Sequence, residues 1–122
     1  MTEVKTMRIG EVAEQTSLSL RTLRHYEDIG LVIPSGRTDG GFRLYTDRDV
    51  ARLLIVRRMK PLGYTLDEMS ALLHVVDALE REERADLRAR LTEIREEARI
   101  RREKLAAQVD MADEFLARLD RL

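Results

Sequence analysis

The sequence contains no cysteine, so disulfide bonds, thiolate metal sites, iron–sulfur clusters and thiol redox switches are excluded. It also contains no run of 18 apolar residues, and its first seven residues do not form the apolar core of a signal peptide. We therefore expect a soluble, cytoplasmic protein that does not enter a membrane and that holds no metal ion or cofactor.

Recognisable catalytic patterns are also missing. The sequence shows no pair of carboxylates suited to acid–base chemistry, no nucleophile with a neighbouring base and no glycine-rich phosphate loop. Its two histidines, His25 and His74, lie far apart in the chain. We expect no catalytic residues and therefore no enzyme.

The charges of the chain are unevenly distributed. Residues 1–64 contain 11 Lys and Arg against 8 Asp and Glu, a net charge of +3. Residues 65–122 contain 11 against 15, a net charge of −4, which brings the whole chain to −1. The basic half favours an anionic partner. A length of 122 residues allows one domain, or a small domain followed by one long helix.

Two short helices are predicted near the N-terminus. Apolar residues recur at helical spacing over residues 9–16, and Ser19 is a suitable N-cap for a second helix that ends at Gly30. We expect this second helix to turn Leu20, Leu23 and Ile29 inward. Ser17 falls where the turn between the helices would favour a left-handed residue. Two helices joined in this way form a helix-turn-helix.

A β-hairpin is predicted next. Residues 37–38 and 42–45 read as two short strands around the turn formed by Asp39, Gly40 and Gly41. Capping boxes then predict two more helices. One begins at Thr46 and stops at Gly63, and the other begins at Thr65 and packs through apolar residues that include Leu66 and Met69.

A long helix is predicted from about Glu82 to Leu122, where neither glycine nor proline occurs. Apolar residues recur there every seven positions, with a one-residue slip near the middle, which is typical of a coiled coil. A lone charged helix would leave this stripe uncovered, so we expect a second copy of the chain to cover it. The residues of the stripe, called the seam below, are Leu87, Leu91, Ile94, Ala98, Leu105, Val109, Ala112, Leu116 and Leu119.

Two groups of side chains in the first half suit DNA binding. Arg21, Thr22 and Arg24 lie in the first turns of the second helix, whose N-terminal residues approach base edges in the major groove. Arg37 and Arg43 face each other across the hairpin, and we expect Tyr45 to share a face with Arg43. Such a ribbon can clamp the phosphate backbone.

Some of these assignments have alternatives. Tyr26 reads either as a phosphate contact or as a half-buried aromatic residue. Lys60, like Arg57 and Arg58, suits either a phosphate contact or the negative end of the third helix. The full set of predicted DNA contacts is Ser19, Arg21, Thr22, Arg24, His25, Tyr26, Arg37, Arg43, Tyr45 and Lys60.

Taken as a set, these motifs resemble the MerR family of bacterial transcription regulators. The matching segments are Ile9-Gly10-Glu11-Val12-Ala13, Arg21-Thr22-Leu23-Arg24-His25-Tyr26-Glu27, Gly41-Phe42-Arg43-Leu44-Tyr45 and Leu62-Gly63-Tyr64-Thr65-Leu66-Asp67-Glu68. The resemblance implies a mainly α fold: a winged helix-turn-helix DNA-binding domain over residues 7–76, then a linker and dimerisation helix over residues 77–122 that forms an antiparallel coiled coil.

The resemblance also implies a function. Family members bind a pseudo-palindromic promoter site as homodimers and bend and untwist the DNA, so that RNA polymerase can engage the promoter. The chain departs from the family pattern at His25 and Phe42, where many members have tyrosine. It also resembles a short form that lacks both the sensory cysteines and a separate ligand-binding domain, so the sequence identifies no effector.

Two other interpretations remain open. An architectural protein, excisionase-like or chromosome-organising, would bend DNA without controlling a promoter. A protein-interaction module would use the coiled coil to recruit a partner without binding DNA. The intact basic clusters favour DNA binding over the second alternative.

Overall fold

The computed structural model describes residues 5–122. The first four residues, which belong to the N-terminal stretch considered above for a signal peptide, lie outside the described residues. The chain divides into two compact units between Leu73 and His74, and each unit is described by itself. The predicted domain boundary between residues 76 and 77 stays a prediction.

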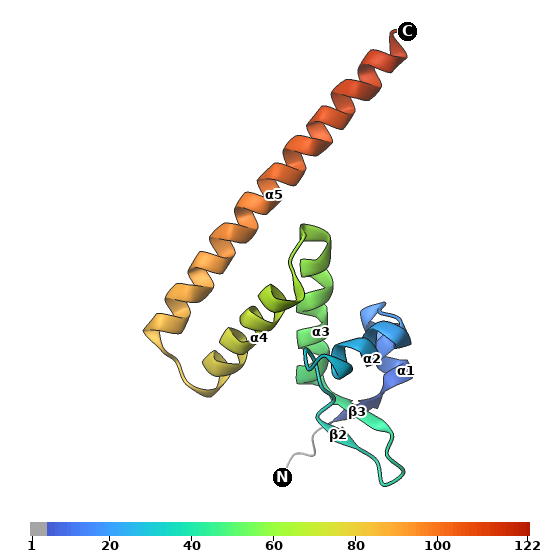
Figure 1. Cartoon of the computed structure of the whole chain (residues 1–122), viewed down its shortest axis with the longest axis vertical. Coiled ribbons are helices and arrows are strands. Elements are labelled where there is room, and N and C mark those ends of the chain that lie inside the picture. Colours follow the sequence, from blue (N-terminus) through green and yellow to red (C-terminus); the bar gives the residue numbers. More distant parts are fainter. Residues whose placement is uncertain (1–4) are drawn as a thin grey trace. The chain divides into compact units, whose positions relative to one another are not determined.

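The helix-turn-helix is confirmed in the first unit. Strand β1 (Thr6–Arg8) leads into α1 (Ile9–Thr16), and α2 (Leu20–Asp28) follows after a short turn (Figure 1). Ser19 caps α2, because its side-chain oxygen accepts a hydrogen bond from the backbone N–H of Thr22 at 3.0 Å. Ser17 has a φ of 57°, the left-handed conformation expected from its place in the turn.

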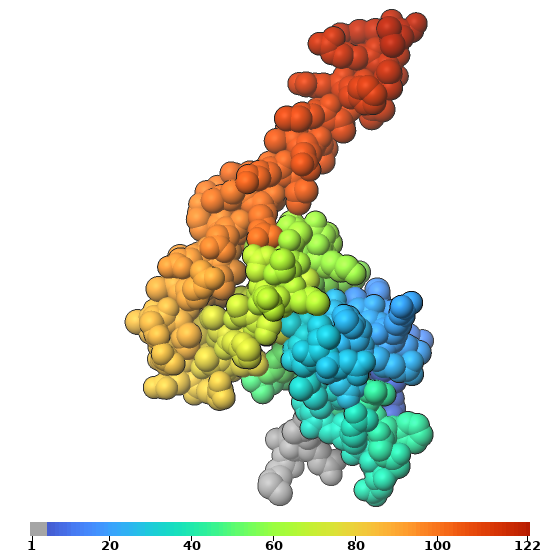
Figure 2. Space-filling view, viewed as in Figure 1, coloured from blue at the N-terminus to red at the C-terminus, as the bar shows by residue number. Residues whose placement is uncertain are grey.

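The predicted hairpin is part of a three-stranded antiparallel sheet. Strands β2 (Gly36–Arg37) and β3 (Arg43–Thr46) form the hairpin, and β1 pairs with the other edge of β3, giving the order β1-β3-β2. We call residues 36–46 the wing. Its turn, in blue-green to green, projects from the body of the first unit in Figure 2. Strand β1 was not predicted because three residues are too few to show an alternating pattern.

Both predicted capping boxes are present. Helix α3 (Asp47–Met59) continues into a 3₁₀ turn, η1 (Lys60–Leu62), and α4 (Leu66–Arg81) follows. At the start of α3, Thr46 and Asp49 bond each other's backbone N–H through their side chains. Thr65 and Glu68 do the same at the start of α4. Each pair satisfies N–H groups that a helix start leaves without intrahelical partners.

One hydrophobic core holds the first unit together. Leu23 and Tyr26 enter it from α2, so the other face of that helix is left at the surface. The prediction that Leu20, Ile29 and Leu66 point inward was wrong, because they are 40%, 44% and 42% exposed. All three lie at or beyond helix ends, where helical spacing no longer decides burial. The core residues are Met7, Val12, Leu23, Tyr26, Val32, Tyr45, Val50, Leu53, Val56, Met59, Met69 and Leu73.

The second unit contains the predicted long helix. Helix α5 (Ala85–Asp120) has 36 residues, which corresponds to a length of about 54 Å at the usual rise per residue. The seam differs along its length: Ile94 is buried, and Leu87, Leu91 and Ala98 are half-buried. From Leu105 onwards every seam residue is exposed. None of the helices among residues 5–122 is long and apolar enough to cross a membrane.

Candidate nucleic-acid interface

Helix α2 presents a polar, basic face to solvent. Arg21, Arg24 and His25 are exposed, because Leu23 and Tyr26 occupy the buried face. Ser19 is committed to the cap: besides accepting from the Thr22 N–H, its hydroxyl donates to the Thr22 hydroxyl at 2.9 Å. The two hydroxyl side chains therefore fix the start of the helix, and the two arginines beside them remain at the surface.

A cleft of about 580 Å³ lies in the first unit between α2 and the segment that joins α3 to α4. It gathers five of the predicted contact residues, although they are up to 39 positions apart in the chain. The residues that line the cleft are Arg21, Thr22, His25, Tyr26, Lys60, Tyr64, Thr65, Leu66 and Met69.

The electrostatics of this cleft favour an anion. Arg21 and Lys60 contribute positive charge from opposite sides of it. The N-terminus of α4 adds the positive end of a helix dipole, since the cleft is also lined by Thr65 and Leu66. Tyr26 belongs to the core and is only 4% exposed, yet it also lines the cleft. Burial raises the pKa of its hydroxyl. The cleft can thus hold a stretch of polyanionic backbone beside the exposed face of α2.

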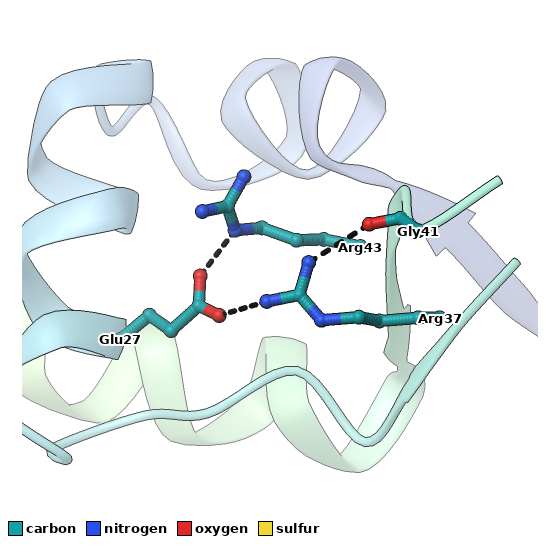
Figure 3. A network of polar contacts seen from close by, with 4 residues as sticks. All are labelled: Glu27, Arg37, Gly41 and Arg43. Atoms are coloured by element: carbon teal, nitrogen blue, oxygen red, sulfur yellow. Dashed lines mark hydrogen bonds and ion pairs between the residues drawn. The ribbon is translucent and has the colours of Figure 1, made fainter.

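In the wing, Arg37 and Arg43 are directly opposite each other across β2 and β3, as predicted. Both bind the same carboxylate, that of Glu27 in the last turn of α2 (Figure 3). Arg37 donates one terminal nitrogen to Glu27 at 2.5 Å and the other to the carbonyl oxygen of Gly41 at 2.9 Å. Arg43 donates its Nε to Glu27, and this hydrogen bond raises the pKa of Arg43. The three side chains join the wing to α2, and we call them the Glu27 bridge.

The structure contradicts the predicted phosphate contact of Tyr45. Its side chain is fully buried, and its hydroxyl has no hydrogen-bond partner among the described residues. Tyr45 does follow Arg43 by two positions on β3, but it pairs with Met7 of β1 in the sheet. At that end of the strand the shared face covers the core. Tyr45 therefore has a structural role and is left out of the proposed interface.

Tyr45→Phe should leave DNA affinity unchanged and should not lower the free energy of unfolding, because it removes a buried hydroxyl that has no partner. Its effect should depend on pH. Burial raises the pKa of Tyr45 above its ordinary value of 10.0, so ionisation favours the unfolded chain and stability falls as the pH rises above about 10. The variant should lose less stability than the wild type between pH 9 and pH 11 in urea unfolding. Equal losses would contradict the burial of this hydroxyl.

Sequence reasoning missed two features of this surface. One is the pairing of Glu27 with the wing, since its place in the helix motif does not mark it as a partner of the two arginines. Arg8, which precedes α1, places its guanidinium 5.0 Å from the ring centre of Phe42 at the wing turn, where cation and ring attract each other. Phe42 is 62% exposed. No local pattern marks either contact, since each joins segments that only the fold brings together.

Comparison with known proteins places this chain in a family. A family model described as "MerR HTH family regulatory protein" matches residues 7–75. The chain is 44% identical over 70 residues to the mercuric resistance operon regulatory protein of Bacillus cereus, covering 57% of this chain and 53% of that protein. It is 34% identical over 111 residues to the transcriptional regulator CueR of Vibrio cholerae, covering 91% and 79% of the two chains.

A solved structure with the same fold is HiNmlR, a MerR family regulator lacking the sensor domain and bound to promoter DNA. The TM-score is 0.72 at 24% identity, and the match covers 93% of this chain and 89% of that one. The chain spans about half the length of several curated relatives that it matches, 53% and 54% for two of them.

Proposed function

Because the chain belongs to the MerR family of helix-turn-helix regulatory proteins, we propose that it is a sequence-specific DNA-binding transcription regulator of the cytoplasm. The observation that carries this proposal is the cleft beside α2, where Arg21, His25 and Lys60 come together from separate segments. A neighbour with the same fold is described as bound to promoter DNA, and CueR is named a transcriptional regulator.

In this proposal α2 enters the major groove. Arg21 and Arg24 read base edges there, because a guanidinium can bond a guanine edge through two hydrogen bonds. His25, Tyr26 and Lys60 bind the backbone along the cleft, and the wing binds the backbone beside it. Ser19 and Thr22 support the start of α2, and the Thr22 side chain is half-buried at the cleft wall.

We propose that the active form is a homodimer. The exposed seam supports this, since Leu105, Val109 and Leu116 are 38%, 60% and 57% exposed in the single chain. A second, antiparallel copy would cover this stripe and would place two α2 helices on one pseudo-palindromic site. Binding both half-sites would bend and untwist the promoter, so that RNA polymerase can engage it.

Arg21→Ala should weaken binding to the protein's own site by about 1–3 kcal/mol per contact and relax specificity at one base pair in each half-site. The site is found by genome-wide mapping of bound DNA. Affinity is then measured by fluorescence anisotropy on that duplex and on duplexes with single base changes.

Arg95→Ala is the matched control, because it removes an exposed arginine from α5. It should bind like the wild type. If Arg21→Ala kept full affinity and full base preference, the role of α2 would be wrong. A wild-type protein with no affinity for any duplex would refute the proposed function itself.

A further inference from the structure

The Glu27 bridge ties the wing to the helix that reads the bases. Glu27 is only 13% exposed, and each of its two carboxylate oxygens binds a different wing arginine. The two arginines lie 10 and 16 residues further along the chain. Because Glu27 belongs to the same short helix as Arg21 and Arg24, the position of the wing is linked to the position of the base-reading face.

The bridge uses the two arginines differently. Arg37 binds within the protein through both terminal nitrogens, one to Glu27 and one to the Gly41 carbonyl of the wing turn. Arg43 binds Glu27 through Nε alone. Figure 3 draws no contact to its two terminal nitrogens, and no hydrogen bond joins them to a described residue. A guanidinium held by Nε keeps a two-pronged end that matches a phosphate.

From this geometry we propose that the two wing arginines have separate roles, with Glu27 as the positioning residue for both. Arg37 is a strut that holds the wing turn against α2, because both of its terminal nitrogens are bonded within the protein, and Arg43 is the phosphate ligand of the wing. This inference rests on the proposed function and deepens it. It also implies that Glu27 weakens the attraction of the wing to DNA, because its single negative charge lowers the net charge of the bridge from the +2 of the two arginines to +1.

The first test is the salt dependence of binding to a mixed-sequence duplex, measured by fluorescence anisotropy for Arg37→Gln and Arg43→Gln. Each phosphate contact contributes about 0.9 to the slope of log affinity against log salt concentration. Arg43→Gln should lower the slope by about this amount per protomer, while Arg37→Gln should leave it nearly unchanged. Equal losses of slope in the two variants would overturn the division of roles.

The second test is Glu27→Gln, which keeps the shape of the side chain and removes its charge. It should raise affinity for mixed-sequence DNA several-fold at low salt, because the wing gains net positive charge. It should also lower the ratio of specific to mixed-sequence affinity several-fold, because the wing is no longer held in register with α2. A residue that only stabilised the fold would lower both affinities, and that result would overturn the positioning role.

Asp28→Asn is the matched control. It removes the same charge one residue further along, from an exposed side chain that acts on Arg43 through its charge and without a hydrogen bond, so the affinity ratio should stay at its wild-type value. If Asp28→Asn lowered the ratio as much as Glu27→Gln, charge alone would explain the effect and the bridge would have no special role.

A measurement without DNA separates this inference from the proposed function. In NMR spectra of the free protein, Glu27→Gln and Arg37→Gln should both speed hydrogen exchange at the amides of Thr38 and Gly41, which bond within the wing turn, whereas Arg43→Gln should change it little. If hydrogen exchange at these two amides were unchanged in Glu27→Gln, the strut role of Arg37 would be overturned, even with normal DNA binding. A wild-type protein that bound no duplex would refute the phosphate-binding role of Arg43 together with the proposed function. Hydrogen exchange would still test the strut role of Arg37.

Discussion

A chain in which Leu105 and Leu116 are both replaced by glutamate should sediment as a monomer, while the wild type should sediment as a dimer. Both leucines belong to the seam and are 38% and 57% exposed in the single chain. In the proposed dimer each copy contributes two of them, so four leucines would be covered. Full burial of an exposed leucine stabilises by about 1.5–3 kcal/mol, and about half of each side chain is still exposed in the single chain, so the loss of these leucines should weaken the dimer by roughly 3–6 kcal/mol. Carboxylates in an apolar seam add a desolvation cost to this loss.

The same variant should lose affinity for the operator. A monomer carries one α2 helix and can bind one half-site, so it loses the gain that comes from holding two sites at once. Sedimentation velocity and operator anisotropy at the same protein concentrations measure the two effects together.

Ala106→Glu with Ala117→Glu is the control for the dimer prediction. These alanines have the same 11-residue spacing but lie outside the seam, each about 100° around α5 from the leucine that precedes it. The control adds the same charge and should remain a dimer. If the leucine variant stayed dimeric, the assignment of the seam as the dimer interface would be wrong. If the wild type were a monomer at working concentrations, the proposed homodimer would be refuted.

Asp49→Ala should cause a large loss of stability in the first unit. Asp49 is 3% exposed, and its carboxylate accepts three hydrogen bonds. The donors are the backbone N–H and the hydroxyl of Ser35, at 3.0 and 2.8 Å, and the backbone N–H of Thr46, at 2.9 Å. The alanine leaves these donors without their acceptor, at a cost of about 1–3 kcal/mol for each one that stays buried. A loss of several kcal/mol is a large part of the stability of a small domain.

Urea unfolding monitored by circular dichroism measures this loss. Asp47→Ala is the control, because Asp47 is an exposed residue in the first turn of the same helix. Its removal should cost only about 0.3–1 kcal/mol, the usual value for a charge near a helix N-terminus. If both variants lost the same free energy of unfolding, the buried hydrogen bonds of Asp49 would not stabilise the first unit more than the exposed charge of Asp47 does.

The contacts of Asp49 also show why local signals in the sequence were informative. The exchange of hydrogen bonds between Thr46 and Asp49 spans three residues, and so does that between Thr65 and Glu68. The cap at Ser19 and the left-handed Ser17 are equally local. Interactions within one helical turn depend on the residues of that turn, so the sequence predicted where α2, α3 and α4 start without any knowledge of the fold.

The long helix was predictable for a related reason. A stripe that repeats every seven residues is a property of one continuous helix, and α5 forms over Ala85–Asp120 within the predicted range. The family was also recognisable from sequence, because its motifs follow one another in a fixed order that a short scan can detect. The family model confirms this over residues 7–75.

The tertiary structure alone decided which side chains of the wing face outward and which are paired. Arg43 and Tyr45 share one face of β3, yet Tyr45 is buried over the core and Arg43 extends beyond it to Glu27. The cleft likewise gathers Arg21 and Lys60 from segments 39 positions apart. Burial and pairing of this kind depend on which distant segments fill the same space, and spacing along the chain carries no information about that.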